Sequence, residues 1–287
     1  MKLAIFDIGG TTVKTGYFVN DCLIDQSSFT TPKSFADLIK KMHQLIDDQE
    51  ITGIAISAPG AVDTKLGKIN GISAVPYIHH RPIFKELVQE FQLPVAIEND
   101  ANCAGICEVK IGAGKDYQNV AFIVIGTGIG GAVFIDKKLY KGSHLFGGEF
   151  GLIKTAAGPT LSLRATIVKA AAAYEKQTGA SQVNGEKLFA LSEQDDQLAQ
   201  KLITQIYDDL ANALYDIQVA FDFDALIIGG GVSAHPGFSA ELAKRLQDQL
   251  TEQSVAEIMP VVKSCQYHND ANLYGAAYNF IVVNGRE

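Results

Sequence analysis

The sequence has few of the features that mark secreted, membrane-spanning or nucleic-acid-binding proteins. Its four cysteines contain no CxxC pair and are too few for a disulfide framework, and Cys103 and Cys107 are interpreted as buried small residues. No run of about 18 apolar residues is present, and the apolar stretch at the start is too short for a signal peptide. With a net charge of -8 and no basic stripe, the chain is expected to be cytoplasmic and to bind neither membrane nor nucleic acid.

A chain of 287 residues, 47% of them hydrophobic, can bury a large core, and two domains are expected at this length. Short β-rich runs alternate with helical patterns, which indicates an α/β fold. Gly112 and Gly114 end one helical pattern, so we place the domains at residues 1–114 and 115–287. The last helix, within 271–283, can pack back on the N-terminal domain. Helical periodicity also predicts one continuous helix over 161–177.

Two glycine-rich turns join pairs of β-rich segments, and the two segments resemble each other. The first reads AIFDIGGTTVKTGYFVNDCL and the second AFIVIGTGIGGAVFIDKKL. Both contain the opening Ala, a central Ile-Gly, an aromatic residue in the second strand and a closing Leu. Such an internal repeat predicts two related α/β domains with a ligand cleft between them.

Gly126, Gly128 and Gly131 fit the pattern GxGxxG, but the β-rich run AVFID follows where a dinucleotide-binding fold needs a helix. The P-loop pattern GxxxxGK[ST] is absent. Each turn taken alone is interpreted as an ordinary tight hairpin. Two matched turns favour phosphate binding, because backbone N–H groups without Cβ atoms can converge on an anion and the hydroxyls of Thr11, Thr12 and Thr127 add donors.

Asp7 and Asp100 each have two competing interpretations. Asp7 ends the first β-rich run, where it either caps the turn or holds Mg²⁺ against phosphate oxygens, while Lys14 is interpreted as facing solvent. Asp100 is either a helix N-cap or a base that takes the proton of an alcohol. A helix cap needs only one polar residue, whereas this strand end supplies Glu98, Asn99 and Asp100. The cluster therefore favours the interpretation of Asp100 as a base. The side-chain amide of Asn99 can both donate and accept hydrogen bonds, so it suits the orientation of a polyol.

Glu149 lies between glycines in FGGEFG, so its carboxylate is either a sugar ligand or a solvated loop residue. The six histidines show no metal-ligand spacing, and the adjacent His79 and His80 are interpreted as solvated loop residues.

Five motifs together resemble the ROK family, a group of sugar kinases and sugar-responsive repressors, and the likeness spans nearly the whole chain. The matching stretches are DIGGTT, SAPGAVD, VPYIHHRPIFKELVQEFQLPVAIENDANCAG, IGTGIGGAVFIDKKLYKGSHLFGGEFG and IIGGGVS. The resemblance implies two related domains of the actin and hexokinase type, which are ribonuclease H-like. It also implies that Asp100 is the general base and that Asn99 and Glu149 hold the sugar. By the same resemblance, ATP is bound by Gly9, Gly10, Thr11, Thr12, Thr127, Gly128, Gly130, Gly230 and Gly231, with Mg²⁺ on Asp7 directly or through water.

One region departs from the family pattern. Leu152 stands where the family usually has a histidine that contacts sugar and binds zinc, and Ser162 stands where it has a glutamate. The cysteine-rich zinc loop is reduced to Ile153–Pro159, so we expect no structural zinc. Two expected sugar contacts are lost with the family's histidine and glutamate, so the resemblance does not identify the sugar that this protein binds.

The resemblance implies an ATP-dependent kinase acting on a hexose, an amino-hexose or a β-glucoside, most often at the 6-hydroxyl, in a homodimer. The alternative is a non-catalytic sugar-binding regulator. It would lack a DNA-binding segment, because ROK repressors carry that segment ahead of the first phosphate loop and Asp7 follows Met1 closely. A phosphotransferase for acetate or glycerol would share the fold but not the EFG and NDAN motifs.

Overall fold

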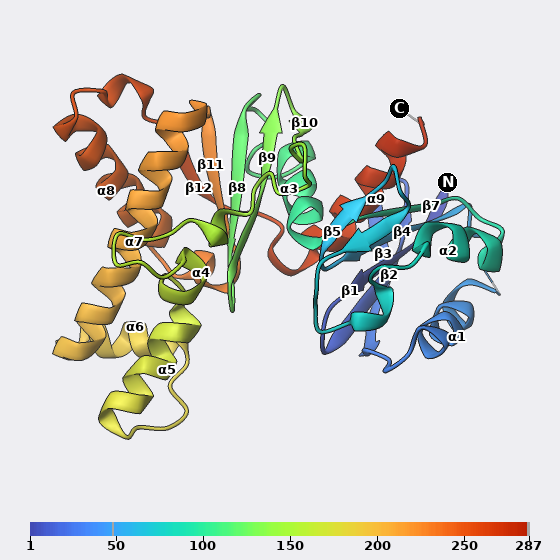
Figure 1. The fold of residues 1–287 in the computed structure, drawn as a ribbon, viewed down its shortest axis with the longest axis horizontal. Coiled ribbons are helices and arrows are strands. Elements are labelled where there is room, and N and C mark those ends of the chain that lie inside the picture. The colour runs from blue at the N-terminus through green and yellow to red at the C-terminus, as the bar shows by residue number, and fades with distance from the viewer. Residues whose placement is uncertain (48, 286–287) are drawn as a thin grey trace. The chain divides into compact units, whose positions relative to one another are not determined.

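The computed structural model describes residues 1–47 and 49–285, which form two compact units (Figure 1). Unit 1 comprises Met1–Lys110, Gly142–Phe146 and Asn269–Glu287, and unit 2 comprises Ile111–Lys141 and Gly147–His268. The chain therefore returns from unit 2 to unit 1 directly before its last helix. Among the described helices, none is both long and apolar enough to cross a bilayer.

Unit 1 is built on a mixed five-stranded sheet in the order β3-β2-β1-β4-β7. The first three strands are antiparallel neighbours, and β1, β4 and β7 run parallel to one another. A small hairpin, β5 (Ala61–Asp63) and β6 (Lys68–Asn70), follows β4. The strands of the sheet are β1 (Lys2–Ile8), β2 (Thr12–Val19), β3 (Cys22–Thr30), β4 (Gly53–Ala58) and β7 (Val95–Asn99).

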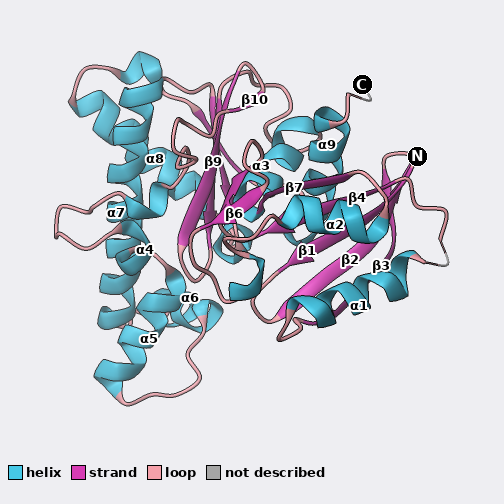
Figure 2. Ribbon diagram, turned by 45° about the vertical axis from the view of Figure 1, so that its right-hand side comes forward, coloured by secondary structure: helices cyan, strands magenta, loops and turns pink. Residues whose placement is uncertain are grey.

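The sheet of unit 1 lies between two helical layers (Figure 2). Successive side chains of each strand point to alternate layers. One face buries Ala4, Phe6 and Ile8 against α1 (Phe35–Ile46) and α2 (Ile83–Phe91). The other face is covered by α9 (Ala271–Val283), which packs along α3 (Asp100–Lys110). Close approach of α9 requires glycine, because a Cβ at Gly275 would lie 1.7 Å from the Cys103 carbonyl oxygen.

Unit 2 repeats this sheet in the order β10-β9-β8-β11-β12. Its first three strands are again antiparallel neighbours, and β8, β11 and β12 are parallel. The repeated topology confirms the predicted pair of related α/β domains. The strands are β8 (Val120–Ile125), β9 (Ile129–Ile135), β10 (Lys138–Leu139), β11 (Ala225–Gly229) and β12 (Val261–Ser264).

The helices of unit 2 share one core with the face of β8 that carries Ala121, Ile123 and Ile125. The longer ones are α5 (Ile167–Thr178), α6 (Gly185–Glu193), α7 (Gln197–Phe221) and α8 (Phe238–Glu252). The single helix predicted over 161–177 is wrong. Helix α4 (Leu161–Arg164) ends with Ala165 as its C-cap, and Thr166 caps α5 by accepting a hydrogen bond from the Lys169 N–H. Single 3-10 turns occupy Pro76–Ile78, Phe150–Leu152, Gly231–Ala234, Ala256–Ile258 and His268–Asp270.

Candidate active site

The carboxyl ends of the three parallel strands in unit 1 place polar residues in one row. Asp7 on β1 is the register partner of Ser57 on β4, and Ser57 is the partner of Glu98 on β7. All three belong to the sheet face that α9 covers, because they share the strand parity of the residues beneath that helix. The Ser57 hydroxyl donates to Asp7 Oδ1 at 2.7 Å. This edge is where open α/β sheets bind ligands.

Asp100 begins α3, and its carboxylate is oriented by the residue before it. Asp100 Oδ1 accepts hydrogen bonds from the Asn99 side-chain amide at 3.0 Å and from the Ala101 N–H at 2.9 Å. Asn99 itself caps the helix, because its Oδ1 accepts from the Asn102 N–H at 3.1 Å. Its Nδ2 also donates to the Gly60 carbonyl at 3.1 Å. Both amide hydrogens and one acceptor position of Asn99 are therefore used inside the protein.

Glu98 is buried and serves the backbone of this strand end. Its Oε1 accepts from the Asn99 N–H at 2.8 Å and from the Asn102 amide at 2.9 Å. Cys103, one turn into α3, is fully buried. Burial, with smaller contributions from the carboxylates of Glu98, Asp7 and Asp100, raises the pKa of the Cys103 thiol well above its ordinary value. Cys103 is thus a neutral packing residue beneath the carboxylates.

The first glycine turn presents its tip to solvent. The Gly9 N–H is used within the turn, where it donates to the Thr12 carbonyl at 3.0 Å. Thr31 fixes the turn from β3, since its hydroxyl donates to the Gly9 carbonyl at 2.6 Å. Gly10, Thr11 and Thr12 are exposed. Of the predicted phosphate-binding residues in this turn, the exposed tip is better placed than Gly9 to meet a ligand.

The second glycine turn is held by Ser162, a residue that sequence reasoning treated only as a missing sugar contact. The Ser162 hydroxyl accepts from the Ile129 N–H at 2.9 Å and donates to the Ile129 carbonyl at 3.1 Å. Gly126 N–H donates to the Gly128 carbonyl at 2.8 Å and closes the turn. Thr127 at the tip is exposed.

The segment around Glu149 packs directly on the strand that follows this turn. A Cβ at Gly148 would lie 2.6 Å from the Gly131 carbonyl oxygen, and one at Gly151 would lie 1.9 Å from the Ile129 carbonyl oxygen. Between these glycines, Glu149 is exposed to solvent. Desolvation nevertheless raises the pKa of its carboxyl above the ordinary value. Leu152, the substitute for the family histidine, is also exposed.

The third glycine loop lies against the second turn. Gly230 adopts a φ of +86°, and a Cβ there would lie 2.1 Å from the Ile125 carbonyl oxygen at the end of β8. Together the two loops line a hollow of about 420 Å³, whose wall includes the ring of His235, stacked on Phe189 with the ring centroids 3.7 Å apart. The largely apolar lining suits a planar base. Its other members are Ile167, Val168, Asn184, Gly185, Glu186, Val232, Ala234 and Pro236.

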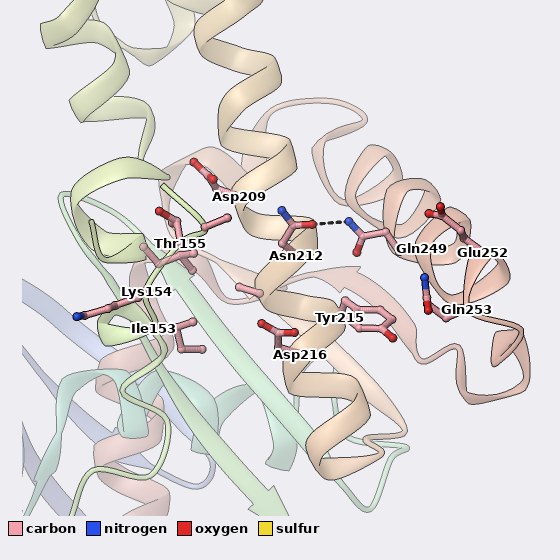
Figure 3. A pocket seen from close by; sticks show the side chains of 13 residues that line it. Ile153, Lys154, Thr155, Asp209, Asn212, Tyr215, Asp216, Gln249, Glu252 and Gln253 are labelled. Carbon is pink, nitrogen blue, oxygen red and sulfur yellow. Dashed lines mark hydrogen bonds between the residues drawn. The ribbon is translucent and has the colours of Figure 1, made fainter. Parts of the chain in front are cut away.

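A larger hollow in unit 2, of about 660 Å³, lies elsewhere (Figure 3). Its walls are the 153–156 loop, α7 and the end of α8, where Asn212 accepts a hydrogen bond from Gln249. The described residues that line it include none that the sequence predicts to bind phosphate or sugar. The smaller hollow, by contrast, is lined by Gly126 of the second turn and by Gly231, which the sequence predicts to bind ATP.

His79 is not the solvated residue that the sequence suggested. It is buried, its Nε2 lies 2.7 Å from the Ser73 hydroxyl, and its ring lies beneath Gly60. Burial lowers the pKa of His79 below its ordinary value. Because the Gly60 carbonyl accepts from Asn99, His79 supports the loop that orients Asp100. His80 is exposed, as expected.

The acidic side chains of the site suit a metal ion that is bound mainly by substrate phosphates and water. Among the described residues, no group of three or more His, Cys, Asp or Glu side chains could hold an ion. Mg²⁺ commonly binds through one or two carboxylates plus substrate phosphates and water, and Asp7 beside the first turn fits that pattern.

The shortened loop over Ile153–Pro159 is held by backbone contacts. The Thr155 N–H donates to the Pro159 carbonyl at 2.9 Å, and Lys154 forms an isolated antiparallel β-bridge with Thr160.

Comparison with known proteins agrees with these motifs. The profile of the ROK family matches residues 3–282. The chain belongs to the ROK family. This ROK protein is 33% identical to a β-glucoside kinase of Listeria monocytogenes, covering 100% of the chain and 99% of that relative. It is 32% identical to a β-glucoside kinase of Klebsiella pneumoniae, with 98% and 96% covered. A solved ROK family protein from Streptococcus pneumoniae, in complex with sucrose, aligns over all of both chains with 36% identity and a TM-score of 0.93.

Sequence reasoning missed three side chains in this ROK protein that hold predicted site residues. Ser57 and Asn272 both donate to Asp7, and Ser162 holds the second turn. Only Ser57 carries a usable signal, since it opens the motif SAPG near the end of a buried strand. The other two act through contacts that no local pattern encodes.

Proposed function

We propose that the protein transfers the γ-phosphoryl group of ATP to the 6-hydroxyl of a sugar, with a β-glucoside as the favoured class. Full-length likeness to relatives named β-glucoside kinase supports sugar phosphorylation. The observation that carries the assignment of the base is the Asp100 carboxylate, fixed at a strand's carboxyl end by the Asn99 amide and its own helix. A carboxylate held in this way is prepared to accept a proton without reorganising.

In the proposed reaction, Asp100 accepts the proton of the sugar hydroxyl as that oxygen attacks the γ-phosphorus. The new bond joins the sugar oxygen to phosphorus, and the bond between the γ-phosphorus and the oxygen that bridges it to the β-phosphate breaks. ADP leaves with the bridging oxygen, and Asp100 later returns its proton to solvent. Mg²⁺ bound with ATP supplies charge neutralisation at the phosphate oxygens, and Asp7 is the residue that would hold it.

ATP is assigned to three glycine loops. We propose that the exposed tips Gly10–Thr12 and Thr127–Gly128 contact phosphates through N–H and hydroxyl donors, with Gly9 and Gly130 shaping the turns. Gly230 and Gly231 approach the nucleoside closely because they lack Cβ atoms. The base occupies the hollow under His235 and Phe189.

The sugar is assigned to Glu149 and, through its remaining acceptor position, Asn99. The preference for a β-glucoside is supported by the names of the relatives and by two side chains. Leu152 presents an apolar surface where the family has a histidine, and the Ser162 hydroxyl is engaged by Ile129. Neither side chain then offers a hydrogen bond to a free anomeric hydroxyl. A sugar that is substituted at the anomeric oxygen therefore loses no hydrogen bond there.

A panel of sugars tests the proposal directly. ADP release would be measured with glucose, N-acetylmannosamine, cellobiose and a simple alkyl β-glucoside, and the phosphorylated carbon would be located by NMR. We expect the β-glucosides to give the highest kcat/KM and a phosphate on carbon 6. Thermal stabilisation by sugars without ADP release from any of them would instead identify a non-catalytic sensor.

A further inference from the structure

The carboxylate of Asp7 is held from two directions by residues far apart in the chain. Ser57 on β4 donates to Asp7 Oδ1 at 2.7 Å, and the Asn272 amide in the first turn of α9 donates to the same oxygen at 3.0 Å. Two donors fill the usual acceptor capacity of a carboxylate oxygen. Among the described residues, no group hydrogen-bonds Oδ2.

Asn272 is itself fixed, because the start of α9 is fastened to the edge of the same sheet. Lys14, the cross-strand partner of Asp7 on β2, donates from Nζ to the Asn269 carbonyl at 3.1 Å. Lys14, interpreted as facing solvent, is partly exposed, and its ammonium group makes this hydrogen bond. One turn further along α9, Gly275 contacts the backbone of Cys103 in α3. The position of the Asn272 amide is thus set on both sides of it.

We propose that Asn272, together with Ser57, is a positioning residue for Asp7, which fixes Oδ1 internally and leaves Oδ2 for the metal ion that accompanies ATP. This inference rests on the proposed function only for the identity of the nucleotide. Residues of this kind, which hydrogen-bond a metal-binding carboxylate, orient it and tune its affinity. The first turn of α9 adds a favourable field, because the N-terminus of a helix stabilises a nearby anion.

The same helix links Asp7 to Asp100. Asn272 contacts Asp7 directly, whereas Gly275 allows α9 to lie against α3, which Asp100 begins. A change in α9 would therefore reach the carboxylate assigned to the metal and the carboxylate assigned to the proton. We assign to Asn272 an effect on metal binding alone, because its side-chain amide donates its hydrogen bond to Asp7.

The test is the effect of Mg²⁺ on binding of a non-hydrolysable ATP analogue, measured by calorimetry with Mg²⁺ and with a chelator. In the wild type, Mg²⁺ should tighten binding, and Asp7→Ala should remove that gain. Asn272→Ala should reduce the gain by about 10-fold while leaving binding in the chelator unchanged. Ser57→Ala should act in the same direction. Asn284→Ala is the matched control, because Asn284 lies at the far end of α9 and its side chain donates only to the Phe280 carbonyl among the described residues.

The half-buried position of Asn272 makes Asn272→Ala compatible with folding, which thermal melting would verify. Asn272→Asp serves as the second variant. It keeps the shape but sets an acceptor against Oδ1, so it should lose at least as much of the Mg²⁺ effect as Asn272→Ala. A full Mg²⁺ effect in both variants, or in Asp7→Ala, would overturn the inference. If the wild type phosphorylates no sugar, the proposed function fails, but this binding measurement still decides the role of Asn272.

Discussion

The side-chain amide of Asn99 donates a hydrogen bond to Oδ1 of Asp100 at 3.0 Å while its carbonyl caps the helix that Asp100 begins. Asn99→Asp separates the two roles, because an aspartate keeps the cap acceptor but removes both donors. We expect kcat to fall about 100-fold through misplacement of the base. Asn99→Leu, which also loses the cap, should unfold more easily by a further ~1 kcal/mol. Equal kcat for Asn99→Asp and the wild type would contradict the orienting role.

Replacement of the proposed base gives the most direct kinetic result. Asp100→Asn keeps the size and the hydrogen bond from the Ala101 N–H but cannot accept the substrate proton. We expect kcat to fall about 100- to 10,000-fold, with nearly unchanged affinity for the ATP analogue. Steady-state kinetics and calorimetry on the same preparation would measure both. Wild-type turnover in this variant would remove Asp100 from the mechanism.

Ser162 should matter for ATP rather than for sugar. Ser162→Ala leaves the Ile129 N–H without its side-chain partner and should cost about 1 to 3 kcal/mol of unfolding free energy. Because the second turn loses its support, KM for ATP should rise more than KM for the sugar. Ser162→Glu restores the family residue but faces Gly151, where a Cβ would already lie 2.2 Å from the Ser162 hydroxyl, and should destabilise more. Ser181→Ala, on an exposed loop, is the control.

Gly275 provides a test of the packing between α9 and α3. Gly275→Ala would place a methyl group against the Cys103 backbone and should destabilise the protein by about 1 to 3 kcal/mol. For comparison, Gly231→Ala meets no atom within 4 Å and should leave the melting temperature nearly unchanged. Denaturant unfolding of both variants decides the point. Similar stabilities would mean that α9 shifts at little cost.

A pH-dependent contribution to stability is expected at His43. Hydrogen bonds to Asp47 and then to Glu90, at 2.8 and 2.9 Å, raise the pKa of His43 above its ordinary value. A raised folded-state pKa means that the stabilisation is fully present below the unfolded pKa of about 6.5 and is lost as pH rises through the folded value. His43→Gln should therefore lower the melting temperature more in mild acid than in mild alkali. The effect should stay below ~1 kcal/mol because the imidazole is partly exposed.

Two controls complete the pH experiment. Asp47→Asn with Glu90→Gln removes the two carboxylates and should abolish the pH-dependent difference while keeping the histidine. His144, on an exposed loop of the chain, provides a histidine replacement without such partners. Identical losses for His43→Gln at both pH values would show that only the packing of the ring on Phe91 matters.

The sequence predicted those features that local patterns encode. Glycine turns between β-rich runs gave the hairpins β1–β2 and β8–β9, and their repeat gave two related sheets. The strand β3 was missed because its exposed residues, such as Asp25 and Ser27, show no alternation with apolar ones. The helix α6 was also missed, although its cap, Asn184, bonds the Lys187 N–H and could have been recognised.

Contacts over long separations account for most of the remainder. The bond between Asp7 and Asn272 joins residues 265 positions apart, and no periodicity reports it. The roles of Asn99 and Ser162 were assigned from a family likeness that describes ligands. Their hydrogen bonds within this chain depend on how the neighbouring backbone closes, which a single sequence does not specify.

The glycines on either side of Glu149 have a thermodynamic consequence. Gly148 and Gly151 lie directly against the backbone of β9, so the segment carrying Glu149 packs on the strand that leaves the second turn within unit 2. A ligand that immobilises the turn also immobilises Glu149, and the loss of conformational entropy occurs only once. Sugar and ATP should therefore each tighten the binding of the other, by the same factor in either order of addition.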